Sequence, residues 1–492
     1  NEHAGKQEAA MKQEILRFEN VTCKKDGAVY LDNFSFYMTA GEIVGLLSVN
    51  DRGIKELIEL TAKNHPIDAG RVYMGGKLVN SYLNQEETSN RIYQIDQKSS
   101  LINDLSIADN LFVMRPGFKK QVINEWVLRE QADRVLKQLS MDLDLNKRVE
   151  RLTTMERIMV EIAKAYLMGS KLLVVLYPEK LIGQADFPQF HQLLRKMQSM
   201  GISTLYFCYH HWIMFKICDR IALFSRGRIK KLFEPEEFRE EAIAPYIYYF
   251  KENTVFKPKV DQGYMLELKN ITDGDIHNLS LGIKPGECIT LLDSGDQIMD
   301  RLTGILAGEY VDYEGDIFCS HKKMEKKVKS SLDRGMIVLD DNPAQSFLFS
   351  EMSYLENLTF LLDRKLKKSI LKQSYINSVR SEYYGEAGDV IDTKYIDSLS
   401  LKEKYGLIYN KISLFHPKIL VVKKPFAYGD MHCRTYILKR MQELKAAGVS
   451  ILLLTGYLTD CVYISDHIGI VKDGSFSVLL EPQEYGITSR LF

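Results

Sequence analysis

Apolar and polar residues follow two alternating periods along this chain. Short apolar runs rich in β-branched and aromatic residues, such as STLYFC at 203–208 and VSILLLT at 449–455, have the length of buried strands. The segment 121–139 instead repeats its apolar residues at helical spacing. In the segment 66–79 two strand-like stretches flank a Gly-Gly pair, which predicts a hairpin. This order predicts α/β domains, each with a mainly parallel sheet, flanking helices and an antiparallel β portion.

The pattern occurs twice, because segments of the first half recur in the second. LDNFSFYMTAGEIVGLL at 31–47 recurs as IHNLSLGIKPGECITLL at 276–292, and LSIADNLFV at 105–113 recurs as MSYLENLTF at 352–360. A nearly constant offset over most of the chain predicts two homologous domains in tandem. Four pairs of identical residues share an offset of 247 positions: Asn110 and Asn357, Lys171 and Lys418, Asp219 and Asp466, Gly227 and Gly474.

The boundaries of the repeat predict four segments. Residues 1–13 form a flexible leader, residues 14–250 the first domain, residues 251–263 a linker, and residues 264–492 the second domain. The linker is expected because KENTVFKPKVDQG is charged and contains a proline.

Composition narrows the classes of function. The 492 residues carry 65 basic and 65 acidic side chains, so the chain lacks the excess positive charge typical of nucleic-acid binding. Its seven cysteines are scattered without C-x-x-C pairs, which favours free thiols and no metal site. The longest apolar runs are strand-sized, far short of the roughly 20 residues that span a bilayer. We predict a cytoplasmic protein that reaches the inner face of the cell membrane only through a partner.

The segment GEIVGLLSVNDRGIKELIEL at 41–60 has the order of a phosphate-binding loop without its residues. A strand, a turn with a glycine and an amphipathic segment follow one another, as around the pattern G-x-x-x-x-G-K-[ST]. Here Gly53 is followed by Ile54 and Lys55. Ile54 has no donor for a phosphate, and one step along a helix turns the next side chain by about 100°, away from the ligand. The segment therefore predicts the P-loop fold and disfavours phosphate binding.

The chain resembles the tandem ATP-binding-cassette proteins of bacterial sugar importers of the ribose and galactose type. The phrases that carry the resemblance connect the catalytic motifs, and include DAGRVYMGGK, LSIADNLF, EIAKAYL and CDRIALFSRGRI. The resemblance implies two nucleotide-binding domains, each with an antiparallel β-subdomain and a helical subdomain, that pair as an intramolecular pseudo-dimer. It also implies ATP hydrolysis with Mg²⁺ and a membrane permease as partner.

In the first half, the resemblance places unusual residues at the catalytic positions. Ile54 stands for the lysine that contacts the β- and γ-phosphates, Leu176 for the aspartate that orients magnesium, and Tyr177 for the glutamate that activates water. Tyr209 stands for the switch histidine, and the signature LSGGQ becomes LTTME at 152–156. Four residual positions of the nucleotide site remain: Asn50, Gly53, Lys55 and Gln97.

The second half departs further from the pattern. Met299 stands for the phosphate-loop lysine, Lys423 and Lys424 replace the magnesium and water-activating acids, and Tyr457 stands for the switch histidine. The signature begins LSLKE and has lost both glycines. Acidic residues in place of the loop repel a triphosphate. These residues are Asp293, Asp296 and Asp300.

These departures predict that no catalytic residue and no metal ligand remains, and that no cofactor is required, with ATP and Mg²⁺ bound weakly at most. Losing one oriented donor from a charge-stabilising site costs roughly 10²- to 10³-fold in rate. Here the lysine, the magnesium ligand, the water-activating acid and the signature are all replaced. The favoured function is a non-hydrolysing scaffold or regulator that docks on a sugar permease, a sensor or a true ATPase, with no nucleic-acid partner.

Two alternatives stay open. In the first, Lys55, Lys423 and Lys424 supply charge to phosphates in an ATP-driven importer subunit with unorthodox residues, and metal-dependent turnover would identify it. In the second, the emptied nucleotide cleft holds another small molecule, so that the chain is a sensing module.

Overall fold

The computed structural model describes residues 13–25, 27–83, 88–112, 125–246, 263–328, 331–366 and 372–481. The chain divides into two compact units, here called unit 1 and unit 2. Unit 1 comprises residues 1–182 and 186–247, and unit 2 comprises residues 183–185 and 248–492. Of the predicted leader and linker, all but Gln13 and Gly263 lie outside the described residues.

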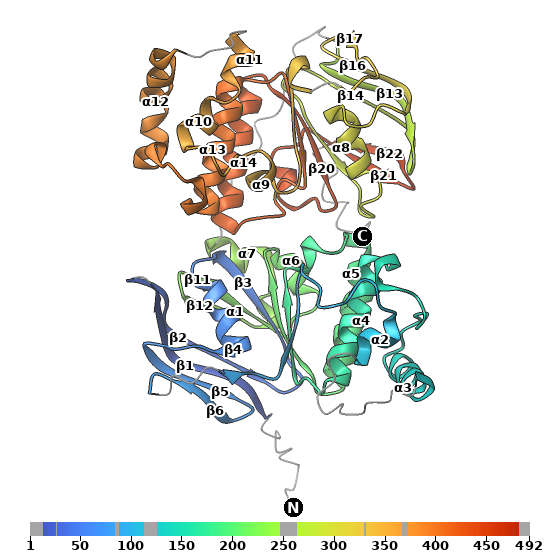
Figure 1. Ribbon diagram of the computed structural model, residues 1–492, viewed down its shortest axis with the longest axis vertical. Coiled ribbons are helices and arrows are strands. Elements are labelled where there is room, and N and C mark those ends of the chain that lie inside the picture. Colours follow the sequence, from blue (N-terminus) through green and yellow to red (C-terminus); the bar gives the residue numbers. More distant parts are fainter. Residues whose placement is uncertain are drawn as a thin grey trace, which may run out of the picture. The chain divides into compact units, whose positions relative to one another are not determined.

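Unit 1 contains two main sheets (Figure 1). One is antiparallel, with strand order β2-β1-β5-β6. The other has the order β12-β11-β3-β10-β9-β8 and is parallel except for the edge strand β12. Two short strands, β4 and β7, pair separately. The strands are β1 Glu14–Lys25, β2 Ala28–Thr39, β3 Ile43–Asn50, β4 Lys63–Asn64, β5 Ala69–Met74, β6 Lys77–Ser81, β7 Thr88–Ser89, β8 Ile92–Ile95, β9 Leu172–Leu176, β10 Ser203–Cys208, β11 Arg220–Ser225 and β12 Arg228–Phe233.

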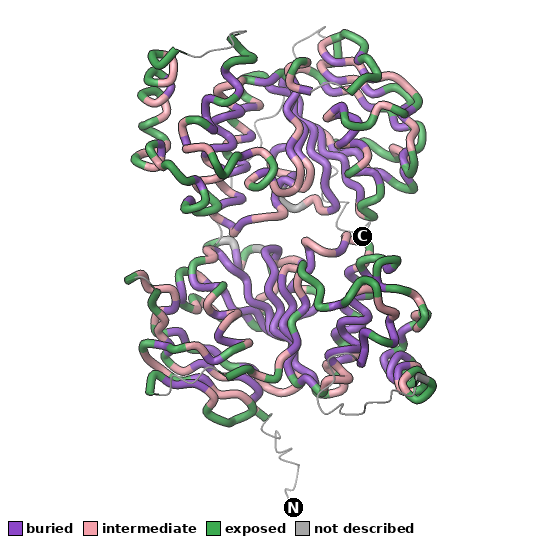
Figure 2. The backbone as a smooth tube through the Cα atoms, in the orientation of Figure 1, coloured by how far each residue is buried: buried purple, intermediate pink, exposed green. Residues whose placement is uncertain are grey.

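Burial explains the two kinds of sheet. Every residue of β9 and β10 is buried, as expected for central parallel strands that are covered on both faces, and these strands form the buried centre of unit 1 in Figure 2. Much of β2 instead alternates buried and exposed side chains, which is typical of an antiparallel strand with one solvated face.

The helices of unit 1 pack around the mixed sheet, and α2, α3 and α4 contact one another to form a helical part (Figure 1). The helix expected at 121–139 is present as α3, while residues 121–124 lie outside the described part. The helices are α1 Ile54–Ala62, α2 Ile107–Phe112, α3 Glu125–Gln138, α4 Thr154–Leu167, α5 Phe187–Ser199, α6 His211–Phe215 and α7 Glu240–Ile243.

The predicted hairpin is confirmed. β5 and β6 pair in antiparallel fashion across Gly75 and Gly76, which have φ values of 57° and 76°. Two consecutive residues with positive φ make the tight turn that suits the twist of paired strands, and glycine adopts this conformation without a steric penalty.

Unit 2 repeats the topology of unit 1. Its antiparallel sheet has the order β14-β13-β16-β17, and its mixed sheet has the order β22-β21-β15-β20-β19-β18, again parallel except for the edge strand β22. The strands are β13 Leu266–Asp273, β14 Ile276–Ile283, β15 Cys288–Leu292, β16 Glu314–Cys319, β17 Lys322–Lys323, β18 Met336–Leu339, β19 Ile419–Lys423, β20 Ser450–Thr455, β21 His467–Lys472 and β22 Ser475–Leu480. The helices are α8 Met299–Ala307, α9 Pro343–Ser346, α10 Tyr354–Thr359, α11 Leu362–Leu366, α12 Gln373–Ala387, α13 Leu401–Phe415 and α14 Met431–Ala446.

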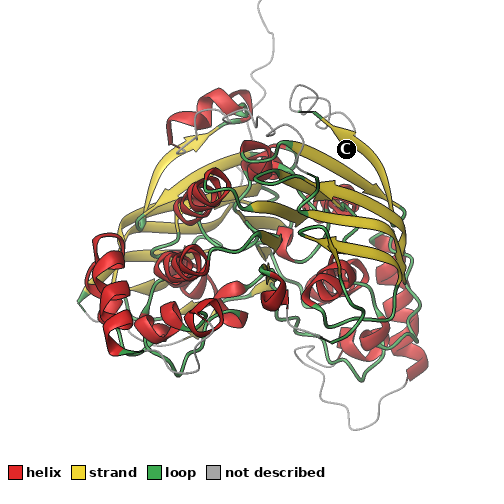
Figure 3. Ribbon diagram, turned by 90° about the horizontal axis from the view of Figure 1, so that it is seen from above, coloured by secondary structure: helices red, strands yellow, loops and turns green. Residues whose placement is uncertain are grey.

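The repeat extends to individual hydrogen bonds. In unit 1 the buried Asn110 side chain donates to the carbonyls of Ile102 and Ser106 and accepts from the Ile102 N–H. In unit 2 Asn357 makes the same bonds to Phe349 and Ser353. Figure 3 shows the same mixture of strand layers and flanking helices in both units. The predicted fold class, two tandem α/β cassettes with antiparallel and helical subdomains, is confirmed.

Candidate functional site

Gly53, in the loop between β3 and α1, is required by close backbone packing. Gly53 has φ 95°, and a Cβ atom there would lie 2.1 Å from the Tyr30 carbonyl oxygen. Any other residue would therefore clash with the backbone of β2. Because this close approach alone requires a glycine, Gly53 is no evidence for a bound phosphate.

Apolar side chains occupy the two positions at which a nucleotide site needs charge. Ile54, at the start of α1, and Leu176, at the end of β9, are each only 4% exposed and belong to the hydrophobic core of unit 1. Neither side chain supplies a donor to phosphate or an oxygen ligand to Mg²⁺. The residues present in unit 1 therefore do not fit the cationic anchor and the metal that the resemblance implies.

The positions of the water-activating acid and the switch histidine are filled by two stacked tyrosines. The rings of Tyr177 and Tyr209 lie 4.4 Å apart at 20°, and the Lys180 ammonium lies 4.5 Å from the centre of the Tyr177 ring. The Tyr209 hydroxyl donates to Asp51 Oδ2 at 2.6 Å. Burial, together with the nearby Asp51 charge, raises the pKa of both tyrosine hydroxyls well above the usual value, so they stay protonated donors.

The buried carboxyl group of Glu179 bonds to the backbone of one of the stacked tyrosines. Glu179 Oε1 accepts the Tyr209 backbone N–H at 2.8 Å. Burial raises the pKa of Glu179 and lowers the pKa of Lys180, while the two opposite charges partly offset both shifts. The sequence analysis did not identify Glu179 and Lys180 as site residues, because only the fold brings them into contact with Tyr209.

The residual nucleotide-site positions have other partners in the structure. Asn50 Oδ1 accepts the Arg52 backbone N–H at 3.1 Å, and the exposed Lys55 ammonium lies 3.8 Å from Glu59. The Gln97 backbone N–H donates to Asp96 Oδ1 at 2.6 Å, and its side chain is exposed.

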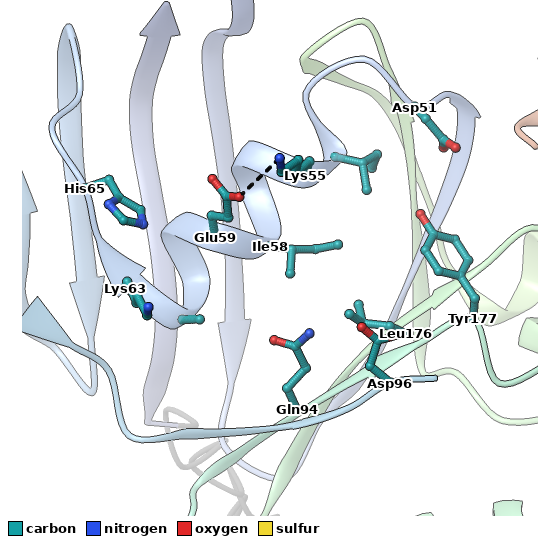
Figure 4. Close-up of a pocket in the computed structure, with 12 residues that line it drawn as sticks. Asp51, Lys55, Ile58, Glu59, Lys63, His65, Gln94, Asp96, Leu176 and Tyr177 are labelled. Carbon is teal, nitrogen blue, oxygen red and sulfur yellow. Dashed lines mark ion pairs between the residues drawn. The ribbon is translucent and has the colours of Figure 1, made fainter. Parts of the chain in front are cut away.

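A cleft of about 730 Å³ opens beside the stack in unit 1 (Figure 4). One wall is formed by α1, and the other by the ends of β8 and β9. The twelve lining residues combine apolar, acidic and basic side chains. They are Asp51, Ile54, Lys55, Ile58, Glu59, Ala62, Lys63, His65, Gln94, Asp96, Leu176 and Tyr177.

In unit 2 the acidic loop pairs with the two lysines at the end of β19. The Lys423 ammonium donates to Asp300 Oδ1 at 2.5 Å and lies 3.8 Å from Asp341 Oδ2. The Lys424 ammonium donates to Asp296 Oδ2. Burial opposes the charge on Lys423, but the hydrogen bond to Asp300 and the neighbouring acids raise the pKa of the ammonium above its usual value. Each lysine is thus paired with an acid of its own unit.

The remaining loop residues of unit 2 are also occupied. Met299 is 1% exposed and lies in the core. Asp293 is buried, and its Oδ2 accepts the Ile298 N–H at 2.8 Å, although burial raises the pKa of its carboxyl group. The Tyr457 backbone N–H donates to the Thr455 hydroxyl at 3.1 Å. With lysines at the positions of the acids, the residues of unit 2 do not fit Mg²⁺ either.

The signature segments have a structural role in both units. Thr153 and Ser400 are N-cap residues of α4 and α13, and each forms a capping box with the glutamate three residues later. In unit 1 that glutamate, Glu156, also accepts two hydrogen bonds from Lys147 at 2.8 and 2.9 Å. The negative charge of Glu156 is therefore paired within its own unit.

The described residues contain neither a metal-ligand cluster nor a membrane-spanning helix. No group of three His, Cys, Asp or Glu side chains in those residues is arranged to hold a metal ion. None of the helices in the described part is both long and apolar enough to cross a membrane.

Comparisons with known proteins agree with the fold and the repeat. A family model described as ABC transporter matches residues 31–175. A ribose import ATP-binding protein of Caldanaerobacter subterraneus is 22% identical over 485 residues, which cover 96% of this chain and 97% of that protein. The chain is related to the sugar-import ATP-binding-cassette proteins.

Other relatives extend this relationship. A xylose import ATP-binding protein of Geobacillus kaustophilus is 22% identical, with 94% of this chain and 95% of that protein covered. Among solved structures, the complex of archaeal ribosomal stalk protein aP1 with an archaeal ribosome recycling factor matches with a TM-score of 0.59 at 15% identity. That match covers 96% of this chain and 92% of the matched chain, and it shows the tandem-cassette fold alone.

Proposed function

We propose that this protein is a cassette subunit that does not hydrolyse ATP and that acts as a scaffold or regulator beside a sugar permease. The observation that carries the proposal is the internal pairing of both loops. Asp51 accepts the Tyr209 hydroxyl, while Asp296 and Asp300 hold Lys424 and Lys423. A Mg²⁺–ATP complex would have to break these contacts and bring its phosphates against carboxylates, with no cationic anchor in exchange.

The surface beside the helical part supports a docking role. In unit 1 Asn110 fixes the loop before α2, and the buried Glu161 of α4 accepts from Tyr93, Ser99 and Ser100 of the preceding segment. These bonds hold a loop on which Ile102 is 45% exposed. A rigid loop with an exposed apolar side chain suits a protein partner, and we propose that a sugar permease docks here and brings the chain to the membrane.

ATP turnover is the first test. The full-length chain is incubated with labelled ATP with and without Mg²⁺, and bound and released nucleotide are measured. We expect no Mg²⁺-dependent turnover. Turnover that disappears in Lys55→Ala or Lys423→Ala would overturn the proposal, and it would identify an importer ATPase with unorthodox residues.

Docking is tested separately by co-purification with a permease of the sugar-import type. Ile102→Glu is expected to reduce recovery of the permease, because it places a charge in an apolar contact. Leu78→Glu is the matched control, since Leu78 is an aliphatic residue of β6 that is 53% exposed. Equal recovery with both variants contradicts docking at this loop.

A further inference from the structure

Unit 2 contains a pocket at the end of its parallel strands opposite to the ionic loop. The pocket has a volume of about 390 Å³, within the usual range of about 300–1,000 Å³ for small-molecule sites. It is lined by residues just before β18 and β19, which are parallel, whereas Lys423 is the last residue of β19. The pocket is therefore separate from the loops that replace the nucleotide site.

The lining of this pocket includes two acidic side chains, and both have cationic partners outside it. Glu325 Oε2 lies 3.5 Å from the Lys327 ammonium, and Asp333 Oδ1 accepts from Arg364 at 3.0 Å. These two carboxylates are thus compensated without the basic residues of the lining.

Four basic side chains also line the pocket, and three of them have no acidic partner within the described part of the chain. The exception is Lys323, whose ammonium lies 2.7 Å from Asp316. The other three are Lys322, Arg334 and Lys418. Positive charge is therefore in excess at this pocket.

The backbone brings these three cations together from separate elements. Lys322 of β17 pairs with Cys319 of β16, so the two side chains lie on the same face of the antiparallel sheet. Cys319 Sγ donates to the Arg334 carbonyl at 3.4 Å. The Lys418 backbone N–H donates to the carbonyl of Gly335, the residue after Arg334, at 2.8 Å.

The Cys319 thiol lies within the field of two of these cations. The side chain is 6% exposed, and burial raises the pKa of the thiol, while the charges of Lys418 and Arg334 act to lower it. The thiol therefore stays neutral near pH 7 and provides no counter-charge. An excess of positive charge around a pocket attracts an anion.

Unit 1 lacks the arginine of this pocket. Arg334 lies two residues before β18, and Asn90 lies two residues before the equivalent strand β8. Asn90 is neutral, and its side chain donates to the Thr61 carbonyl at 2.9 Å and to Asn64 Oδ1 at 3.2 Å. The set of three cations is therefore a feature of unit 2 and not of the repeat.

We propose that this pocket binds a small phosphate dianion, either inorganic phosphate or the phosphate group of a monoester, between Lys322, Arg334 and Lys418. A guanidinium group can bind two oxygens of one phosphate at once, and an ammonium group binds phosphate as a point charge. The inference goes beyond the proposed function and does not depend on it, because the pocket and the former nucleotide loop of unit 2 lie at opposite ends of the parallel strands.

Titration calorimetry on the full-length chain tests the assignment with inorganic phosphate, glycerol 3-phosphate and acetate. At low salt we expect a Kd below about 1 mM for at least one of the two phosphates. Acetate carries a single charge and should bind at least about tenfold more weakly. The phosphate that binds more tightly identifies the source of the ligand, free or esterified. A Kd above about 1 mM for both phosphates, or equal affinity for acetate, overturns the assignment.

Three variants that each remove one charge test the position of the ligand. Arg334→Gln, Lys418→Gln and Lys322→Gln should each weaken phosphate binding about three- to tenfold. Arg334→Lys keeps the charge and should weaken it less than Arg334→Gln. Lys394→Gln is the matched control, because Lys394 is an exposed lysine of unit 2 outside the pocket, and it should change nothing.

Thermal melts verify that each variant folds, and the exposed positions Lys322 and Lys418 keep the test valid if Arg334→Gln does not. Phosphate binding that none of the three pocket variants changes, or that Lys394→Gln weakens equally, overturns the assignment. Neither result bears on the proposed function, which fails only on magnesium-dependent ATP turnover.

Discussion

The two units place an aspartate at the same point of the loop and satisfy it in different ways. In unit 1 Asp51 accepts a tyrosine hydroxyl from the switch position, whereas in unit 2 Asp296 holds an ammonium from the end of β19. Four residues further along, Lys55 of unit 1 corresponds to Asp300 of unit 2. Lys55 lies near Glu59 of its own helix, whereas Asp300 pairs with Lys423. The same fold therefore satisfies the loop aspartate with a tyrosine in one unit and with a lysine in the other.

The difference teaches that two different sets of side chains can satisfy an aspartate at the same loop position. A partly buried carboxylate in this loop costs free energy unless a hydrogen-bond donor or an opposite charge compensates it. In unit 1 the stacked tyrosine rings supply this compensation, and the stability of their packing depends little on salt. In unit 2 ion pairs supply it, and these pairs weaken when salt screens their charges. This contrast predicts how each unit responds to substitution.

The largest expected effect is at the tyrosine stack. Tyr209→Ala removes a ring that is 4% exposed and should lower the free energy of unfolding by about 3–5 kcal/mol, the usual cost of deleting a buried aromatic ring. Tyr457→Ala at the matching position of unit 2, which is only half-buried, should cost about 1 kcal/mol. Denaturant unfolding of the full chain measures both. Equal losses would show that the ring of unit 1 is no more integral than that of unit 2.

A second effect compares two buried lysines at equivalent positions. Lys164 lies near Glu161 in unit 1, whereas Lys411 in unit 2 donates to the Phe347 carbonyl at 2.9 Å and packs over phenylalanine rings. Burial lowers the pKa of Lys411 to about 8. Lys411→Met should therefore stabilise the protein by about 1–3 kcal/mol at pH 7, and Lys164→Met should not.

The pH dependence of Lys411 has a definite sign. The unfolded chain binds this proton up to a pKa of about 10.4, and the folded chain releases it near 8, so stability should rise with pH between these values. Denaturant unfolding at pH 7, 8, 9 and 10 measures the rise as the difference between the wild type and Lys411→Met. A difference that does not change with pH contradicts the assignment.

A smaller effect concerns the ion pairs of unit 2. Lys423→Ala should cost about 1 kcal/mol, because Asp300 is 85% exposed and the pair is screened by water. The exchange Lys423→Asp with Asp300→Lys should recover part of that loss. Urea unfolding in low and high salt measures the set, with Leu176→Ala in unit 1 as the salt-insensitive control. A Lys423→Ala loss that is unchanged by salt would contradict the ionic account.

The smallest effect is at a histidine that replaces an arginine. In unit 1 Arg220 pairs with the buried Glu42 at 2.5 Å, and in unit 2 His467 Nδ1 lies 2.8 Å from Glu287 while its Nε2 lies 3.2 Å from Glu481. The hydrogen bond to Glu287 raises the pKa of His467, although burial opposes it. Its stabilisation is present below the unfolded pKa of about 6.5 and is lost as pH rises through the folded pKa.

Replacing His467 by arginine tests this account. The loss of stability with rising pH should shrink in His467→Arg, because arginine stays charged throughout the range. Unfolding curves between pH 6 and 9 provide the measurement. Identical pH profiles of wild type and variant would exclude His467 as the source.

Much of the fold could be predicted because its signals are local. The apolar run at 203–208 is a strand of the expected bounds, the run at 449–455 forms a strand from Ser450 to Thr455, and Gly75 and Gly76 form the expected turn. The repeat was readable because equal offsets identify equivalent elements. The site was only partly predictable, since the identities of Tyr177, Tyr209 and Lys424 were known in sequence but their contacts depend on which loops the sheet brings together.

The sequence by itself determined the two cassettes, their tandem order and the absence of the usual charged residues at the loops, because period, spacing and side-chain chemistry are written along the chain. Only the tertiary structure decided that Tyr209 reaches Asp51, that Lys424 reaches Asp296, and that α1 and the ends of β8 and β9 line one cleft. The physical reason is that each of these contacts joins strand ends that are far apart in sequence, and parallel strands bring such ends to the same edge of a sheet.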